Sequence, residues 1–350
     1  MLYDLGDTGF RQIFSVSLYK SLGLMLFLVF GISVRSSAQS CCSGGVPAGT
    51  HLGFVRSSEG ALKVNLLYRS VLSRALFSGS EHLEDRLRKR TTQSYLLRLG
   101  YAVGKHWEAE FHLPFIWQTR TIYTNAGGMD FELSRGLGDP FVLLTYAFGA
   151  VGVDAQAASR PSMGGGLVWR LGGGLQMPLG RTDLRNAQGL FFVEDMQPGS
   201  GSWDVLFFSS VYFSPGWRRS MSVYAYGVYT LNGVNRQARG GSFSYTFGDD
   251  FQAVFLLTDQ FLLGSELFFP TLGFWFRALS PDLVNENIPV AGTGGYFLFL
   301  RGGLSWAMPG KWGSLGAVVE LPVYRYVHET QLTPSLAFNL SWTHAFSKLK

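Results

Sequence analysis

Short and long gaps alternate between the strand-like segments of this chain. Segments of about ten residues carry apolar and polar side chains in alternation, as β-strands with one apolar face do. Tight turns separate some segments, and long Gly-rich polar stretches separate others. A soluble sandwich has no need to collect its long loops at one end, whereas an outer-membrane barrel has short periplasmic turns and long outward loops. The spacing therefore predicts a transmembrane β-barrel.

Residues 107–117 show the alternation most clearly, because Trp107, Phe111 and Trp117 share one face and Glu110 and His112 share the other. The same pattern predicts an all-β, antiparallel up-and-down barrel of about twelve strands, with ten to fourteen left open because pattern-based boundaries are loose by a few residues. The twelve segments are 61–72, 91–103, 107–117, 141–148, 164–177, 203–213, 221–229, 250–257, 261–276, 295–307, 313–326 and 335–346.

Composition agrees with strands that face lipid on one side. The chain is 47% hydrophobic, 15% aromatic and only 15% charged. Beyond residue 40 no uninterrupted apolar stretch is long enough for a membrane-spanning helix, and the richest region, 251–269, is broken by Asp259 and Glu266. The 44 glycines also disfavour long helices.

The N-terminal 40 residues have the features of a secretory signal peptide. Arg11 and Lys20 precede an apolar run at 22–34, and small residues follow at 36–40. An anchor helix is the alternative, but the run is shorter than the roughly 20 residues that a bilayer requires. We therefore expect a signal peptide at 1–40, a short periplasmic segment at 41–58 and the barrel at 59–350.

Both cysteines, Cys41 and Cys42, lie at the expected mature N-terminus, so no disulfide framework is expected in the barrel. Lipidation, contact with a partner protein or binding of a soft metal such as Cu(I) are the alternatives for this pair. Two thiolates without a nearby His make a weak site. We therefore predict no cofactor and no metal, with Cys41 and Cys42 the only metal candidates.

The net charge of +5 raises the question of nucleic-acid binding. The basic residues cluster at 86–90, and the acidic residues Glu81, Glu84 and Asp85 lie beside them. This mixture is typical of a solvated loop, and we predict no nucleic-acid partner.

The strand face opposite the apolar one is expected to line the lumen. These side chains either form ion pairs that fill a narrow barrel or line a polar pathway for a small solute. Several aromatic residues, Phe208 and Phe299 among them, share this face, which indicates either partial occlusion or a register error of one residue. The lumen-lining candidates are Arg98, Glu108, Glu110, His112, Arg170, Glu266, Arg301 and Glu320.

No motif indicates catalysis. Neither His112 nor His344 lies in a G-x-S-x-G or H-E-x-x-H pattern, and the glycine runs at 164–166 and 172–174 lack the Lys-Ser/Thr of a phosphate loop. We predict that the chain is not an enzyme and has no catalytic residues.

The last segment alternates aromatic or aliphatic with small residues up to Phe346. This pattern resembles the terminal strand signal of outer-membrane barrels, and the barrel-assembly machinery is therefore an expected partner. Residues 347–350 extend beyond that signal.

Short Gly-rich motifs across most of the expected mature chain resemble outer-membrane transporters related to the MetA-pathway phenol-degradation family. The resemblance implies a barrel fold and transport, with aromatic or other hydrophobic compounds as expected solutes. The motifs are Cys41–Gly45, Gly136–Pro140, Met177–Gly180, Gln197–Asp204, Phe247–Asp249 and Glu320–Tyr324.

We therefore expect a transporter or channel for a small solute in the outer membrane of a Gram-negative cell, in contact with outer-membrane lipid. One alternative is a non-conducting anchor or assembly partner for a periplasmic protein, and another is an outer-membrane lipid enzyme.

Overall fold

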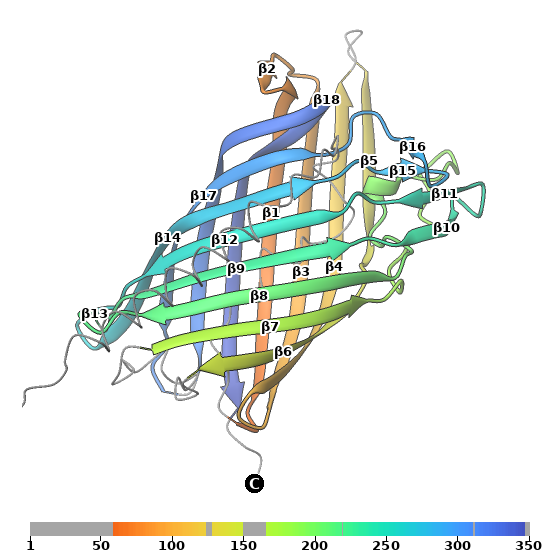
Figure 1. Ribbon diagram of the computed structural model, residues 1–350. Coiled ribbons are helices and arrows are strands. Elements are labelled where there is room, and N and C mark those ends of the chain that lie inside the picture. The colour runs from red at the N-terminus through yellow and green to blue at the C-terminus, as the bar shows by residue number, and fades with distance from the viewer. Residues whose placement is uncertain (1–58, 124–127, 150–165, 219, 311, 347–350) are drawn as a thin grey trace, which may run out of the picture. The chain divides into compact units, whose positions relative to one another are not determined.

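The computed structural model describes residues 59–123, 128–149, 166–218, 220–310 and 312–346, and these form a closed antiparallel β-barrel (Figure 1). Each wall element pairs with the next, β12 pairs with β14, and β18 pairs with β1 to close the ring. The wall elements in ring order are β1 (Leu62–Gly79), β3 (Arg88–Val103), β4 (Trp107–Tyr123), β6 (Phe141–Gly149), β7 (Gly166–Gln176), β8 (Asp204–Ser214), β9 (Ser222–Leu231), β12 (Asp250–Thr258), β14 (Glu266–Leu279), β17 (Gly295–Ala307) and β18 (Ser314–Phe346).

The long element β18 crosses the wall twice. Residues 314–327 pair with β17, and residues 330–346 pair with β1. Counted over the described residues, the eleven wall elements therefore make twelve crossings, which confirms the prediction of about twelve strands. No helix in the described part of the chain is long and apolar enough to span a bilayer.

Several strands are longer than predicted, because they continue beyond the part of the wall with apolar side chains. β1 runs to Gly79, β3 begins at Arg88, and β4 runs to Tyr123. Part of the expected loop at 124–138 is instead strand β5 (Met129–Leu137), which pairs with the upper part of β4, and β2 (Glu81–Leu83) pairs with β1. Backbone groups still need partners there, although the side chains no longer alternate against lipid.

The turn expected at 258–260 lies a few residues later. β13 (Phe261–Leu263) pairs with the start of β14, so the chain reverses around Gly264 and Ser265. Gly264 has φ = +65°, a left-handed conformation that glycine adopts without a steric penalty. The pattern missed this reversal because Phe261, Phe268 and their neighbours are apolar on both sides of it.

The long loops after β9 and β14 build a small sheet of their own. It consists of β10 (Val234–Ala238), β11 (Phe243–Thr246), β15 (Leu283–Val284) and β16 (Ile288–Pro289), at the right of Figure 1. The Tyr245 hydroxyl donates to Asp282 at 2.6 Å, and burial together with this carboxylate raises the pKa of Tyr245. The two loops are therefore fixed to each other.

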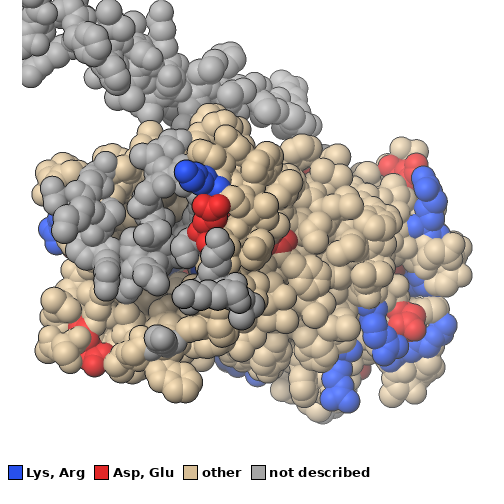
Figure 2. Space-filling view, turned by 90° about the horizontal axis from the view of Figure 1, so that it is seen from below, with Lys and Arg blue, Asp and Glu red and all other residues tan. Residues whose placement is uncertain are grey.

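The outer wall is apolar and the inner side is polar. Leu167, Phe207 and Leu272 are each 55% exposed on the outside, whereas alternate residues such as Arg170 and Glu320 are buried within the barrel. Figure 2 shows a broad band with few charges on the face in view, with most charged side chains gathered toward one end. Exposed Trp217 and Trp312 lie at short turns, where interfacial aromatics settle in membranes. This distribution suits contact with lipid.

One glycine of the wall is required by close packing. A Cβ on Gly273 of β14 would clash with the carbonyl oxygen of Phe255 on the neighbouring strand, whereas a Cβ on Gly302 of β17 would meet nothing within 4 Å. We expect Gly273→Ala to lower the free energy of unfolding by about 1–3 kcal/mol, and Gly302→Ala to leave it nearly unchanged. Urea unfolding of the refolded barrel would measure both, and equal effects of the two changes would contradict this packing.

Candidate functional site

Charged side chains from neighbouring strands meet inside the barrel toward its short-turn end. The guanidinium of Arg98 lies 2.7 Å from Glu110, the Nε2 atom of His112 lies 2.9 Å from the same carboxylate, and Arg170 lies 3.2 Å from Glu108. Each of these residues is at most 8% exposed. Because strand residues alternate between the two sides of the wall, the parity that places Phe111 outside places these groups inside. This set, called the Glu110 cluster below, comprises Lys63, Arg98, Glu108, Glu110, His112 and Arg170.

His112 is held on two sides. Its ring stacks on Phe141, with centroids 4.1 Å apart and planes at 16°, while Nε2 faces Glu110. The residue is completely buried. These contacts give His112 a packing role at the centre of the cluster.

A second group of charges spans the barrel interior. Glu320 of β18 lies 2.9 Å from Arg69 of β1 and 3.1 Å from Arg301 of β17. The Arg69 guanidinium also lies 5.1 Å from the ring centroid of Trp275 on β14, so it reaches toward a strand that is not its neighbour in the wall. Arg69, Trp275, Arg301 and Glu320 are called the Glu320 cluster.

A third ion pair joins Arg277 of β14 to Asp250 of β12, with a closest distance of 2.9 Å. Gln252 donates to the same carboxylate at 2.7 Å. Charge pairing therefore continues along the interior, with both signs always in contact.

Aromatic side chains share the interior with the charges. Phe208, Tyr226, Phe297 and Phe299 are at most 6% exposed, and Trp275 stacks on Phe299 with centroids 4.4 Å apart. The alternative of a register error at these strands is therefore wrong, and the partial occlusion that they indicated is present.

The loop between β7 and β8, residues 177–203, folds inward and is called the constriction loop. Its short 3-10 helix (Glu194–Met196) carries Asp195, which pairs with Arg90 of β3 at 2.6 Å. Arg90 also donates to Gln118 of β4 at 2.5 Å, and Ser134 of β5 donates to the carbonyl of Met196. Met196 is completely buried. The loop is thus attached to the wall strand β3 and to β5.

Arg90 corrects the interpretation of residues 86–90 as a solvated loop, since its side chain is 5% exposed and bonded inside the barrel. It has the same parity as Arg98 on β3, so the period-two pattern extended through 88–90 would have placed it inside. Asp195 had no comparable signal, because it lies in a segment without alternation.

Asp139 ties the constriction loop to the wall at its other end. Its carboxylate accepts hydrogen bonds from the backbone N–H of Gly180, at 2.7 Å, and of Ser200. Burial raises the pKa of this carboxyl, while the backbone N–H groups oppose the shift. Gly180 and Gly199 pack so closely that a Cβ on Gly180 would lie 2.7 Å from the Cα of Gly199.

The loop also contacts the small outer sheet. Arg239, in the turn between β10 and β11, forms a two-pronged ion pair with Glu194, with distances of 2.8 and 2.9 Å. Arg239 has φ = +46°, an uncommon conformation for a residue with a side chain. The long loops therefore form one connected assembly above the bore.

Seven of the eight lumen-lining candidates enter these clusters. Arg98, Glu108, Glu110, His112 and Arg170 belong to the Glu110 cluster, and Arg301 and Glu320 to the Glu320 cluster.

Glu266 is the exception. On β14 it has the parity of the outward-facing Leu272 and Phe274, and it accepts a hydrogen bond from Trp306 near the short turns. The reversal at Gly264, which the pattern missed, lies directly beside it.

Two sequence expectations lie outside the described residues. They are the signal peptide at 1–40 and the periplasmic segment at 41–58 with Cys41 and Cys42.

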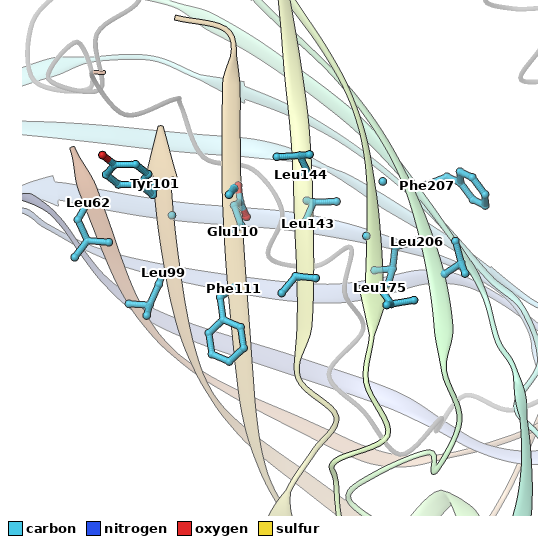
Figure 3. Close-up of a pocket in the computed structure, with 16 residues that line it drawn as sticks. Leu62, Leu99, Tyr101, Glu110, Phe111, Leu143, Leu144, Leu175, Leu206 and Phe207 are labelled. Atoms are coloured by element: carbon cyan, nitrogen blue, oxygen red, sulfur yellow. The ribbon is translucent and has the colours of Figure 1, made fainter. Parts of the chain in front are cut away.

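An apolar groove of about 630 Å³ crosses the outer wall (Figure 3). Most of its lining residues have the outward parity of their strands, and the small residues Ala109 and Gly173 leave space between larger side chains such as Phe111, Leu144 and Phe207. The groove therefore belongs to the lipid-facing surface.

Comparisons with known proteins show which solved structures have a similar fold. No protein-family model matches the sequence, and no curated protein matches it. The structure is similar to that of the COG4313 outer membrane channel from Pseudomonas putida F1, with a TM-score of 0.60 and 12% identity over 84% of this chain and 98% of that chain.

Two further barrels are more distant. The β domain of the Bordetella autotransporter Brka has a TM-score of 0.45 and 13% identity over 82% of this chain and 100% of its own. The transport unit of the autotransporter AIDA-I from Escherichia coli has a TM-score of 0.45 and 7% identity over 85% and 94%. The likeness to the COG4313 channel concerns the fold.

The barrel and its apolar outer wall together define an outer-membrane β-barrel protein. This agrees with the fold and the location that the sequence predicted. The relation to the MetA-pathway phenol-degradation family stays a prediction.

Proposed function

We propose that this protein is a channel for a small solute and that the conformation described above is its closed one. The observation that carries the proposal is the constriction loop, which enters the barrel and is bound there by Asp195 to Arg90. The interior side chains below it are almost inaccessible, for example Glu108 at 2% and Glu320 at 0%. A solute would pass when the loop and the charge clusters rearrange.

The charged interior favours passage over a purely structural role. Burying an ion pair commonly costs more in desolvation than the attraction between the two charges gives back. A barrel that served only as an anchor would therefore be at least as stable with apolar side chains in its interior. Here three separate charge groups follow one another along the interior. Charged and polar linings are the usual means by which membrane pores interact with their solutes.

An outer-membrane channel of this kind would have two partners. Outer-membrane lipid would cover the apolar wall, and an acyl chain would fill the groove at Ala109 and Gly173. The barrel-assembly machinery would recognise the terminal strand that ends at Phe346. Both partners are part of the proposal. The predictions of no enzyme activity, no cofactor, no metal and no nucleic-acid partner also stay predictions.

Planar-bilayer recording of the refolded full chain tests the proposal. Discrete openings whose amplitude or ion selectivity changes in Glu108→Ala and Arg301→Ala would support a channel, because both side chains lie in the interior. A bilayer that stays silent at all voltages would favour the non-conducting anchor.

Loosening the constriction loop should raise the open fraction. Arg90→Ala removes the guanidinium that bonds Asp195 and Gln118, and we expect the ratio of open to closed time to rise at least about tenfold, since hydrogen bonds to charged groups contribute about 1.5–3 kcal/mol each. Single-channel recording measures this. Arg88→Ala, which changes a half-exposed side chain on the same strand, is the control and should behave like the parent. Equal ratios of open to closed time in Arg90→Ala and the parent would contradict a gating role for the loop.

A further inference from the structure

Several buried hydrogen-bond donors of the interior have no acceptor. The Nε and Nη1 atoms of Arg69, the indole Nε1 of Trp275 and the side-chain amide of Asn339 are without hydrogen-bond partners among the described residues. These side chains are 3%, 2% and 4% exposed. Buried donors are almost always paired in folded proteins, so each such group indicates a partner of another kind.

The three side chains occur together. The Arg69 guanidinium lies against the Trp275 ring at 5.1 Å. Asn339 is the direct cross-strand neighbour of Arg69 in the β1–β18 ladder, and both residues are on the inner side. Arg69, Trp275 and Asn339 are called the Arg69 station.

The station carries an excess of positive charge. Arg69 and Arg301 share a single carboxylate, Glu320, so the group has two positive charges and one negative charge. Arg277 and Asp250, by contrast, pair one to one. One more negative charge would balance the Glu320 cluster.

A carboxylate group supplies both the hydrogen-bond acceptors and the negative charge that the station lacks. Its two oxygens match the forked N–H groups of a guanidinium, and its charge balances the second arginine. The stacked rings of Trp275 and Phe299 offer a flat apolar wall for the remainder of the molecule. A neutral solute would supply acceptors without the charge.

We propose that the Arg69 station binds the carboxylate group of a small solute with a flat apolar body. The inference rests on the proposed channel, because it names the class of solute that the bore would select. In the closed conformation the buried donors without acceptors raise the free energy of the protein. A carboxylate that accepts hydrogen bonds from them would therefore stabilise the conformation to which it binds.

Titration calorimetry of the full chain in detergent tests the station with benzoate as the probe. Benzyl alcohol has the same ring without the charge and serves as the comparison ligand. We expect saturable benzoate binding, with benzyl alcohol at least tenfold weaker. Arg69→Met should weaken benzoate roughly 10- to 100-fold while leaving Glu320 its partner Arg301, and Trp275→Phe should weaken it several-fold with the ring retained.

Two variants away from the station are matched controls. Arg218→Met removes an exposed arginine near a short turn, and Trp169→Phe changes a tryptophan on the outer wall. Both should bind benzoate like the parent. If Arg69→Met does not fold, Trp275→Phe and Asn339→Leu test the station in its place, and both should weaken benzoate binding.

Binding and conduction are measured separately, so that each proposal can fail alone. Equal affinity for benzoate and benzyl alcohol, or benzoate binding unaffected by Arg69→Met and Trp275→Phe, would overturn the station even in a conducting barrel. Arg69-dependent benzoate binding in a protein that never conducts would overturn the channel and leave the station standing.

Discussion

Replacing Glu320 with Gln should lower the free energy of unfolding by about 3–5 kcal/mol, because it leaves two buried arginines without a counter-charge. The carboxylate lies 2.9 Å from Arg69 and 3.1 Å from Arg301, and its side chain is completely buried. Water cannot screen the two guanidinium groups at this position. Urea unfolding of the refolded barrel, followed by tryptophan fluorescence, would measure the loss.

An apolar replacement of the whole set separates charge from packing. Arg69→Met, Arg301→Met and Glu320→Leu combined remove all three charges, and we expect this triple variant to recover most of the lost stability. Asp183→Ala is the exposed control, since its partner Arg181 is also exposed and such pairs contribute little. A Glu320→Gln barrel as stable as the parent would show that the arginines find other partners.

The strands of this chain could be predicted from the sequence because the membrane requires apolar and polar side chains to alternate along each of them. Residues 295–307 were predicted and form β17 with the same bounds, and the inner positions of β4, such as Glu110 and His112, follow from alternation alone. Each strand must present apolar side chains to lipid and polar ones to the interior, so parity decides which residues can meet.

The contacts of the constriction loop could not be predicted from the sequence. The alternation of apolar and polar residues carries information only in strands that face lipid, and the loop contains none. Asp195 pairs with Arg90 across 105 residues, and nothing in either segment marks the partner. Strand β5 was also missed, although exposed Phe131, Leu133 and Leu137 alternate in it with less exposed residues. Glu266 was misplaced because the reversal at Gly264 lies inside an apolar stretch, where the pattern gives no sign of a turn.

Asp139→Ala should release the constriction loop without unfolding the barrel. The Asp139 carboxylate accepts hydrogen bonds from the backbone N–H groups of Gly180 and Ser200, which lie near the two ends of the loop. Loss of two hydrogen bonds to a charged acceptor is expected to destabilise the loop by about 3–6 kcal/mol. The strands carry their own ladders, so their stability should change little.

Hydrogen exchange followed by mass spectrometry measures this directly. Amides of residues 180–202 should exchange about 30-fold faster or more in Asp139→Ala, while β1 and β18 keep the exchange rates of the parent. Asp139→Asn retains one acceptor and should give an intermediate rate, and Asp183→Ala in the same loop should give none of the effect. In the proposed channel the loop closes the bore through Asp195, so the freed loop should also raise the open fraction in single-channel recording. Faster exchange without a higher open fraction would separate the loop from gating, and unchanged exchange would show that Asp139 does not hold it.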